Sequence, residues 1–457
     1  MFRFLLIVVT VISLMGCQRS HLEIFPKLDD PELINKKLTV AEMSEDIDAL
    51  IAGVIERHPN LERYADFNIV KAYANKLKAE LKRPMTRVEF YQVIGQLNHT
   101  FGDGHSFLIW AYQEWEELKE SGFKQFPFEV KITQANKIVL ASDYTSKDKT
   151  LNAGQEIQAV NGVNSAQLIE DMQRYVGGES IKLRKQIVAR RFPVLLWAVY
   201  GFDDEYKTLI SGEVVTDLVV DSWQSTAKSE ADHYYKKLDA DTGYILLSHF
   251  DISPDEFETF VDDTFSTIKQ DKISSLIIDI RQNPGGNTDT VSYISSYLAD
   301  KEFKLVSSVV EKLNHDNRGW FNYKGSVGEI INKPWDDEVQ PINSENRFKG
   351  DVYLLVGSVS YSAAIVFATT LQDNDFATLI GEKTGGYANQ SAQGNLFNLP
   401  NSQLRAYITT RLLVRPSGDK ELSHVVPEYP ISETQESIRQ GVDVALEKAK
   451  SLINRKD

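Results

Sequence analysis

Apolar residues recur with a helical period in the first part of the chain. They lie at positions i, i+3, i+4, i+7 and i+8 of one helix face: Ile47, Leu50, Ile51, Val54 and Ile55. The sequence His-Pro-Asn at 58–60 is expected to end this helix, because proline disfavours the helical conformation in the residue before it. Further helices are predicted over 70–81 and after Thr86. Residues 40–115 are therefore expected to form a helical cap.

The pattern changes to strands over residues 125–230. FPFEVKI (126–132) and KIVLASDY (137–144) are rich in β-branched and aromatic residues, which is typical of strands. LNAGQEIQAVNGV (151–163) places a strand between two turn glycines, and a helix is expected from Ser165. This part of the chain is predicted to be a small β-rich domain.

Strands and helices alternate over residues 235–457. The expected strands are 243–250, 274–281, 351–358 and 377–382, each rich in Ile, Leu and Val and each followed by turn or helix signals. A last helix is predicted over 434–454. Alternation of this kind favours an α/β fold in which helices cover a mostly parallel sheet.

The N-terminal sequence MFRFLLIVVTVISLMGCQRS indicates export. The apolar run of residues 4–15 is shorter than the roughly 20 residues that cross a bilayer, and suits a signal peptide. LMGC resembles a bacterial lipobox that closes a lipoprotein signal sequence over residues 1–17, and Cys17, the only cysteine, would become the acylated first residue once the residues before it are removed. The alternative is an ordinary signal peptide with a cysteine near the cut. Residues 18–39 would then tether a lipid-anchored protein in the cell envelope, facing the periplasm or the exterior.

Composition narrows the function classes. The net charge is −15 and the pI is about 5.1, so a nucleic-acid partner is not expected. Acylation of Cys17 would leave no free thiol, which would exclude disulfides within the chain and a cysteine nucleophile.

Hydroxyl groups gather in GSVSYSAAIVFATTLQD (357–373), where a predicted strand turns into a predicted helix. Ser362 would lie at the start of this helix, at the carboxyl end of a strand, where ligands gather in α/β sheets. The alternative is that Ser358, Ser360 and Ser362 only cap the helix. The motif Gly-x-Ser-x-Gly is absent, which argues against an α/β-hydrolase.

Two further stretches carry candidate chemistry. His105 stands in the glycine-rich turn FGDGHSFLIW and is the candidate base, with His99 as a rival. Gly285 and Gly286 follow a predicted strand in DIRQNPGG, where their N–H groups and that of Ala363 can form an oxyanion hole. The alternative for either histidine is a structural role, and the alternative for Gly285 and Gly286 is a simple turn between a strand and a helix.

Together, DIRQNPGG, GSVSYSAAIVFATTLQD and GEKTGG resemble the serine peptidases of family S41, the tail-specific and tricorn-type proteases. The resemblance implies a crotonase/ClpP-like α/β core over 235–457, a PDZ-like domain over 125–230 and the nucleophile Ser362. The branch of the family that uses a lysine base would place that lysine at Tyr387, so the resemblance implies the Ser-His-Glu branch. Its histidine maps to His105.

The glutamate of that branch maps to Glu421, six residues before Pro427 in ELSHVVPE, with Asp419 and Glu428 as other carboxylate candidates. The glycines that usually flank this glutamate are absent. The implied function is an endopeptidase with peptide or protein substrates, no metal and no cofactor. The alternatives are a binding lipoprotein on the same fold, which GEKTGGYANQSAQGNLFNLPNS also resembles, and an esterase. The sequence does not predict the oligomeric state.

Overall fold

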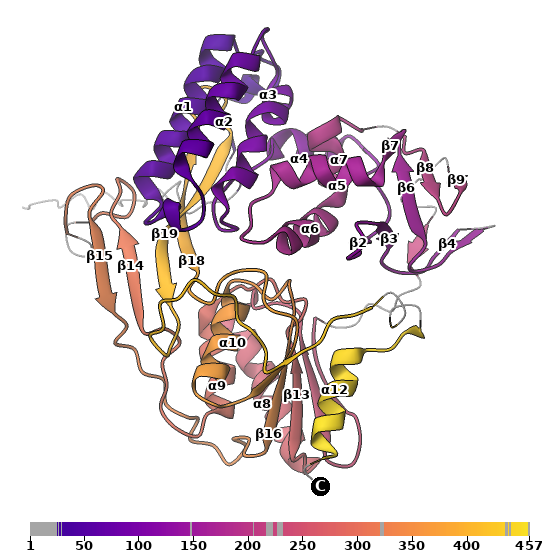
Figure 1. The fold of residues 1–457 in the computed structure, drawn as a ribbon, viewed down its shortest axis with the longest axis vertical. Helices are drawn as coiled ribbons and strands as arrows, with labels where there is room; N and C mark the ends of the chain where they lie inside the picture. Colours follow the sequence, from indigo (N-terminus) through magenta and orange to yellow (C-terminus); the bar gives the residue numbers. More distant parts are fainter. Residues whose placement is uncertain are drawn as a thin grey trace, which may run out of the picture.

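The fold has three parts, which Figure 1 shows as a helical cap, a mixed domain beside it and an α/β core below both. The computed structural model describes residues 25, 27–28, 30–146, 149–203, 205–215, 223–225, 232–319, 324–434, 437 and 440–455. The predicted signal peptide and Cys17 lie outside these residues. Within the described part of the chain, no helix combines the length and the apolar character needed to span a bilayer.

The cap consists of α1 (Val40–Arg57), α2 (Phe67–Glu80), α3 (Arg87–Ile94) and the 3-10 helix η4 (Gly95–Phe101). α1 begins at a capping box, in which Thr39 and Glu42 each accept the backbone N–H of the other. It ends at His58, directly before Pro59, as the sequence predicts. The helices expected over 70–81 and after Thr86 are also confirmed.

The middle domain is built on a sheet of order β2-β3-β6-β8-β9, with β7 added to β6. Its strands are β2 (Val130–Ile132), β3 (Ile138–Leu140), β6 (Glu156–Val160), β7 (Val163–Asn164), β8 (Thr208–Ile210) and β9 (Glu213–Val215). A second sheet joins β10 (Gln224–Ser225), β4 (Tyr144–Ser146) and β5 (Lys149–Leu151). The helices are α4 (Tyr112–Glu120), α5 (Ser165–Met172), η5 (Gln173–Tyr175), α6 (Ile181–Arg190) and α7 (Phe192–Tyr200). Of these helices, the sequence predicts only α5.

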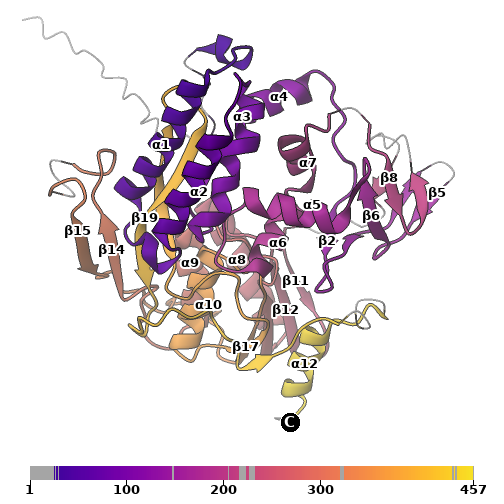
Figure 2. The ribbon, with the colours of Figure 1, turned by 45° about the horizontal axis from the view of Figure 1, so that its top comes forward.

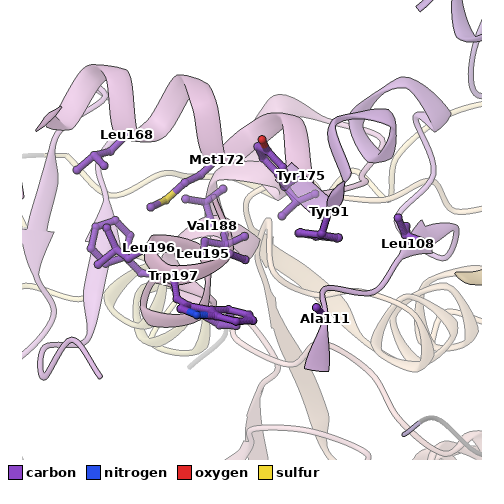
Figure 3. Close-up of a cluster of buried hydrophobic side chains, with 14 of the residues drawn as sticks. Tyr91, Leu108, Ala111, Leu168, Met172, Tyr175, Val188, Leu195, Leu196 and Trp197 are labelled. Atoms are coloured by element: carbon purple, nitrogen blue, oxygen red, sulfur yellow. The ribbon is translucent and has the colours of Figure 1, made fainter. Parts of the chain in front are cut away.

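The cap and the middle domain share one hydrophobic core. Figure 3 shows Tyr91 of the cap beside Tyr175 of the middle domain, and the centroids of their rings are 5.9 Å apart. Met172 and Trp197 extend the same cluster towards the sheet of the middle domain. Burial of apolar surface therefore holds the cap and the middle domain together. His105, which follows the last helix of the cap, is thereby held in place relative to the middle domain.

The core contains a sheet of order β11-β12-β13-β16-β17-β20. The strands are β11 (His233–Lys237), β12 (Thr242–Leu247), β13 (Ser275–Asp279), β16 (Asp351–Val356), β17 (Thr378–Gly381) and β20 (Tyr429–Pro430). Only the β11–β12 pair is antiparallel, so the predicted mostly parallel sheet is confirmed. Helices α8 (Pro254–Gln270), α9 (Thr288–Leu298) and α10 (Ala363–Asp373) cover one face of the sheet, and α12 (Val444–Ile453) covers the other (Figure 1).

The last helix is shorter than the sequence predicts. The periodicity predicts one helix over 434–454, whereas α12 covers only Val444–Ile453; residues 437 and 440 are also helical, and 435–436 and 438–439 lie outside the described residues. Gly441 adopts a φ of 63°, in the left-handed region, which breaks the helical path before α12.

A further sheet, which the sequence analysis does not foresee, links the core to the cap. Its order is β1-β19-β14-β15, and β18 pairs with β19. The strands are β1 (Phe107–Leu108), β14 (Ser308–Lys312), β15 (Ile330–Pro334), β18 (Ser391–Asn398) and β19 (Arg405–Val414). Figure 2 shows the β18–β19 hairpin running beside α1, and Phe107 pairs with Tyr407 across β1 and β19. The hairpin thus joins the turn that contains His105 to the core.

Candidate active site

Ser362 occupies the sharp turn between β16 and α10. Its backbone has φ 54° and ψ −123°, an unfavourable conformation for a residue other than glycine. Its side chain makes no capping hydrogen bond with α10. The capping alternative is therefore wrong for Ser362, and its hydroxyl is left available at the start of the helix.

The neighbouring hydroxyls have structural roles. Ser360 Oγ accepts the N–H of Gly357 at 2.9 Å and donates to the carbonyl of Ile280 at 2.8 Å, which ties the turn to the end of β13. Ser358 is buried. Only Tyr361, the residue before Ser362, directs its hydroxyl towards the cap.

The glycine turn lies directly against Ser362. A Cβ atom on Gly285, which has a φ of 104°, would approach Ser362 Cβ to 2.5 Å and Ala363 N to 2.9 Å. The N–H of Gly285 donates to Asn283 Oδ1 at 2.9 Å, so this conformation does not leave it for an oxyanion. The N–H groups of Gly286 and Ala363 have no acceptor among the described residues. These two amides are the better pair of oxyanion donors.

His105 lies beside the same turn. Its ring stacks on Tyr361 with 4.6 Å between centroids, and Tyr361 Oη lies 3.0 Å from His105 Nδ1. The structure therefore brings the stretches that contain His105 and Ser362 together, although 257 positions separate them in the sequence. Burial lowers the pKa of His105, and the negative charge of Asp103 opposes this shift. A lowered pKa keeps the imidazole neutral, and so able to accept a proton, at neutral pH.

Asp103 is a buried carboxylate that accepts four hydrogen bonds. Its Oδ1 atom accepts from the backbone N–H of His105 at 2.9 Å and from Ser391 Oγ at 2.5 Å. Its Oδ2 atom accepts from Ser106 Oγ at 2.7 Å and lies 3.2 Å from His58 Nε2. Although burial opposes the charge, these donors, His58 first, and the nearby imidazoles lower the pKa of Asp103 to about 2. Asp103 is thus ionised at neutral pH.

Glu179 lies on the other side of Tyr361. Tyr361 Oη is 2.9 Å from Glu179 Oε1, while Glu179 Oε2 is buried without a hydrogen-bond partner among the described residues. Burial, with repulsion from Asp103, raises the pKa of Glu179 to about 8. Glu179 is therefore mostly a neutral acid at pH 7.

The other predicted residues lie apart from this network. Glu421 is exposed, and among the described residues its carboxylate makes no contact with His105. Asp419 Oδ1 accepts the N–H of Glu421 at 2.9 Å, and Glu428 Oε2 accepts the N–H of Leu379 at 2.7 Å, so both have structural partners. Tyr387, at the position where the resemblance would place the lysine of the Ser-Lys branch, packs against His424.

The rival histidine, His99, has a structural partner. Its Nδ1 atom lies 2.6 Å from the carbonyl of Gln96. Its ring packs against Tyr73, with 5.4 Å between the ring centroids. Both contacts are with residues of the cap. His99 therefore has a structural role, which is the alternative that the sequence leaves open for His99 and for His105.

Sequence reasoning missed His58, Asp103, Glu179 and Ser391. Asp103 was within the motif that drew attention to His105, and its position two residues before the histidine was the available signal. The sequence around His58 indicates only the end of a helix, because Pro59 follows it. Ser391 and Glu179 carry no local signal, because each reaches the site only through long-range packing.

Three kinds of comparison bear on this site. The sequence profile of peptidase family S41 matches residues 241–431. A carboxy-terminal-processing protease from Bartonella bacilliformis is 26% identical over 212 residues, which cover 46% of this chain and 43% of that protein. A carboxyl-terminal-processing protease from Picosynechococcus is 28% identical over 170 residues, which cover 36% and 34%. The chain thus aligns with less than half of the length of these curated relatives.

Solved structures support the fold. Mature CPAF superimposes with a TM-score of 0.63 at 14% identity, covering 91% of this chain and 97% of the other. A putative peptidase from Parabacteroides merdae gives a TM-score of 0.51 at 15% identity, covering 91% and 96%. At such low identity these matches concern the fold alone. Residues 241–431 thus match the profile of peptidase family S41, and the two curated proteins with which this part of the chain aligns are processing proteases.

Proposed function

We propose that this protein is a serine-type endopeptidase in which Ser362 is the nucleophile and His105 is the general base. The observation that carries the proposal is the strained, uncapped Ser362 beside the glycine turn and next to Tyr361, which contacts His105. Strain at a strand-to-helix turn is typical of a nucleophilic serine, because it exposes the hydroxyl to the substrate.

The chemistry follows from these groups. Nε2 of His105 removes the proton from Ser362 Oγ as this oxygen attacks the carbonyl carbon of the scissile peptide bond. The N–H groups of Gly286 and Ala363, together with the positive end of α10, stabilise the oxyanion that forms. His105 then donates the proton to the leaving amine, and water hydrolyses the acyl-enzyme by the same steps.

Substrate can approach from the side of the cap. A cavity of about 340 Å³ lies between the cap and the middle domain, and its lining includes Tyr64, Gly102, Glu179 and Arg184. Because Glu179 contacts Tyr361, this cavity adjoins the proposed site. We propose that peptide enters between the cap, the core and residues 125–230, and that the last of these form a PDZ-like domain. The relatives from Bartonella and Picosynechococcus are carboxy-terminal-processing proteases, which supports peptide substrates for this protein.

A fluorophosphonate probe tests the proposed nucleophile. The full-length protein should be labelled covalently, and Ser362→Ala should remove the label while its thermal unfolding stays close to wild type. Ser358→Ala serves as the matched control and should label normally. Absence of labelling in folded wild-type protein would favour a binding protein on the same fold and overturn the proposal.

A second assay separates the peptidase from an esterase. We expect a labelled peptide library and a denatured protein to be cleaved at internal bonds, with cleavage lost in Ser362→Ala. Hydrolysis of simple esters without any cleavage of peptides would contradict the endopeptidase assignment.

We further propose that the protein is exported and anchored in a bacterial membrane by acylation of Cys17. This proposal is supported by the apolar run of residues 4–15 and the sequence LMGC. Cells grown with labelled palmitate should yield labelled wild-type protein and unlabelled Cys17→Ala. A wild-type protein that is released from the cells without label would contradict the anchor.

A further inference from the structure

The Nδ1 atom of His105 lies between two hydroxyl groups. Ser391 Oγ is 3.1 Å away and Tyr361 Oη is 3.0 Å away. Each hydroxyl also contacts a carboxyl group, Asp103 in the first case and Glu179 in the second. The imidazole is thus connected to two acids, each through one intervening hydroxyl.

The direction of the hydrogen bonds through Ser391 follows from the ionised carboxylate. Asp103 can only accept hydrogen bonds, so Ser391 donates its single hydroxyl proton to Asp103 Oδ1. Ser391 Oγ can then only accept from His105, which requires a proton on Nδ1. A neutral imidazole with its proton on Nδ1 has a free lone pair on Nε2, which is the form that a general base needs.

Asp103 is itself held in place. The N–H of Asn60 donates to His58 Nδ1 at 3.1 Å, so a neutral His58 carries its proton on Nε2 and directs it to Asp103 Oδ2. Ser106 Oγ donates to the same oxygen at 2.7 Å. Asp103 and Ser391 are both fully buried, which shields the interaction from water.

We propose that Asp103, acting through the hydroxyl of Ser391, positions His105 and selects its Nδ1–H tautomer, in the role that the sequence analysis gives to Glu421. The inference rests on the proposed function, because it names the positioning residues of that site. It does not rest on any contact of Glu421, whose carboxylate is exposed.

The proton balance is simple. The proton of Ser362 moves to Nε2, and the proton on Nδ1 stays where it is. The imidazolium that forms carries a positive charge, which the carboxylate of Asp103 stabilises across the hydroxyl of Ser391. No proton passes to Asp103, and the imidazole returns to its neutral form when it protonates the leaving amine.

Variants of Ser391 test the proposal. We expect Ser391→Ala to lower kcat/KM and the rate of fluorophosphonate labelling by about 10²-fold, because the tautomer is no longer selected. Ser391→Thr keeps the hydroxyl and should restore most of the rate. The competing assignment to Glu421 makes the reverse forecast, namely that Glu421→Gln loses activity and Ser391→Ala does not.

The pH profile adds a readout that a purely structural role would not change. The ionisable groups that act on the imidazole directly are Asp103 and Tyr361, and Glu179 and Tyr64 interact with these two in turn. Loss of the charge in Asp103→Asn should destabilise the imidazolium and move the acid limb of kcat/KM to lower pH by roughly 1 unit. Ser391→Ala keeps the negative charge of Asp103, so it should shift the acid limb of kcat/KM less than Asp103→Asn does.

A spectroscopic measurement keeps the proposal separate from the proposed function. With ¹⁵N-labelled histidine in the full-length protein, the signal missing from His105→Gln identifies His105, and its nitrogen shifts report the tautomer. We expect Nδ1–H in the wild type and a mixture in Ser391→Ala. An Nε2–H tautomer in the wild type would overturn the inference even in an inactive protein. A correct tautomer with no fluorophosphonate labelling would overturn only the peptidase assignment.

Discussion

The proposed nucleophile, Ser362, and the proposed base, His105, are held by different means. Ser362 is positioned by main-chain geometry within the core, where the turn after β16 and the glycine turn after β13 lie against each other. His105 is positioned by side chains from separate parts of the fold: the end of α1, the loop after η4, the loop before α6 and the start of β18.

Because of this difference, substitutions near Ser362 and substitutions near His105 should have different effects. On the side of Ser362, a Cβ added at Gly285 or Gly286 would meet main-chain atoms within 3 Å, and the main chain cannot move aside as a flexible side chain can. On the side of His105, a lost hydroxyl or charge changes proton positions and pH dependence but leaves the chain path intact. Four predictions use this contrast, in order of decreasing expected effect.

Gly285→Ala should have the largest effect. The new Cβ would approach Ser362 Cβ to 2.5 Å and the carbonyl oxygen of Tyr361 to 2.7 Å, at a φ of 104°. We expect at least ~10²-fold loss of kcat/KM, because the start of α10 and its oxyanion donor must shift. Gly328→Ala is the control, since Gly328 has a φ of 88° but no atom within 4 Å of the added Cβ. Equal losses in both variants would contradict the role of close packing.

Glu179→Gln should change how stability depends on pH. The pKa of Glu179 is raised from 4.5 to about 8, so in this interval the folded protein binds a proton that the unfolded chain releases. The wild type should therefore lose stability as the pH rises from 5 to 8.5, by roughly 2–5 kcal/mol, and the variant should lose less. Urea unfolding at several pH values measures this. Parallel curves for the two proteins would show that Glu179 is not held as a neutral acid.

Asp103 should contribute to stability with the opposite dependence on pH. Its pKa is lowered from 3.8 to about 2, so its stabilising contribution is complete above pH 4 and is lost as the pH falls towards 2. We expect the difference in unfolding free energy between wild type and Asp103→Asn to shrink by about 2 kcal/mol over this interval. A difference that stays constant from pH 5 to 2.5 would mean that the ionised form is not favoured by its four donors.

Tyr387→Phe should have the smallest effect. Tyr387 stands at the position of the lysine in the other branch of the family, and its ring packs against Tyr64 and His424. The ring is retained in the variant, so we expect kcat/KM within about twofold of wild type. A collapse of activity would assign a proton-transfer role to the Tyr387 hydroxyl and shift attention from His105.

The same contrast explains what the sequence could predict. Strands of Ile, Leu and Val, the glycine turn and the hydroxyls before α10 all leave local patterns, so the core sheet and the turn that contains Ser362 were predictable. Ser391 and Glu179 leave none, because their roles arise only when the β18–β19 hairpin and the loop before α6 pack against the cap. Glu421 was placed by a motif that lacked its usual glycines, and the structure leaves its carboxylate exposed.

The β18–β19 hairpin has a consequence for the order in which the chain gains its properties. His105 is synthesised early, Ser362 late and Ser391 later still, and β1 finds its partner only after Tyr407 has left the ribosome. A nascent chain that stops short of this hairpin contains Ser362 and His105 but lacks both Ser391 and the strand that pairs with β1. The position of this hairpin in the sequence therefore sets the point in synthesis at which the proposed site can be completed.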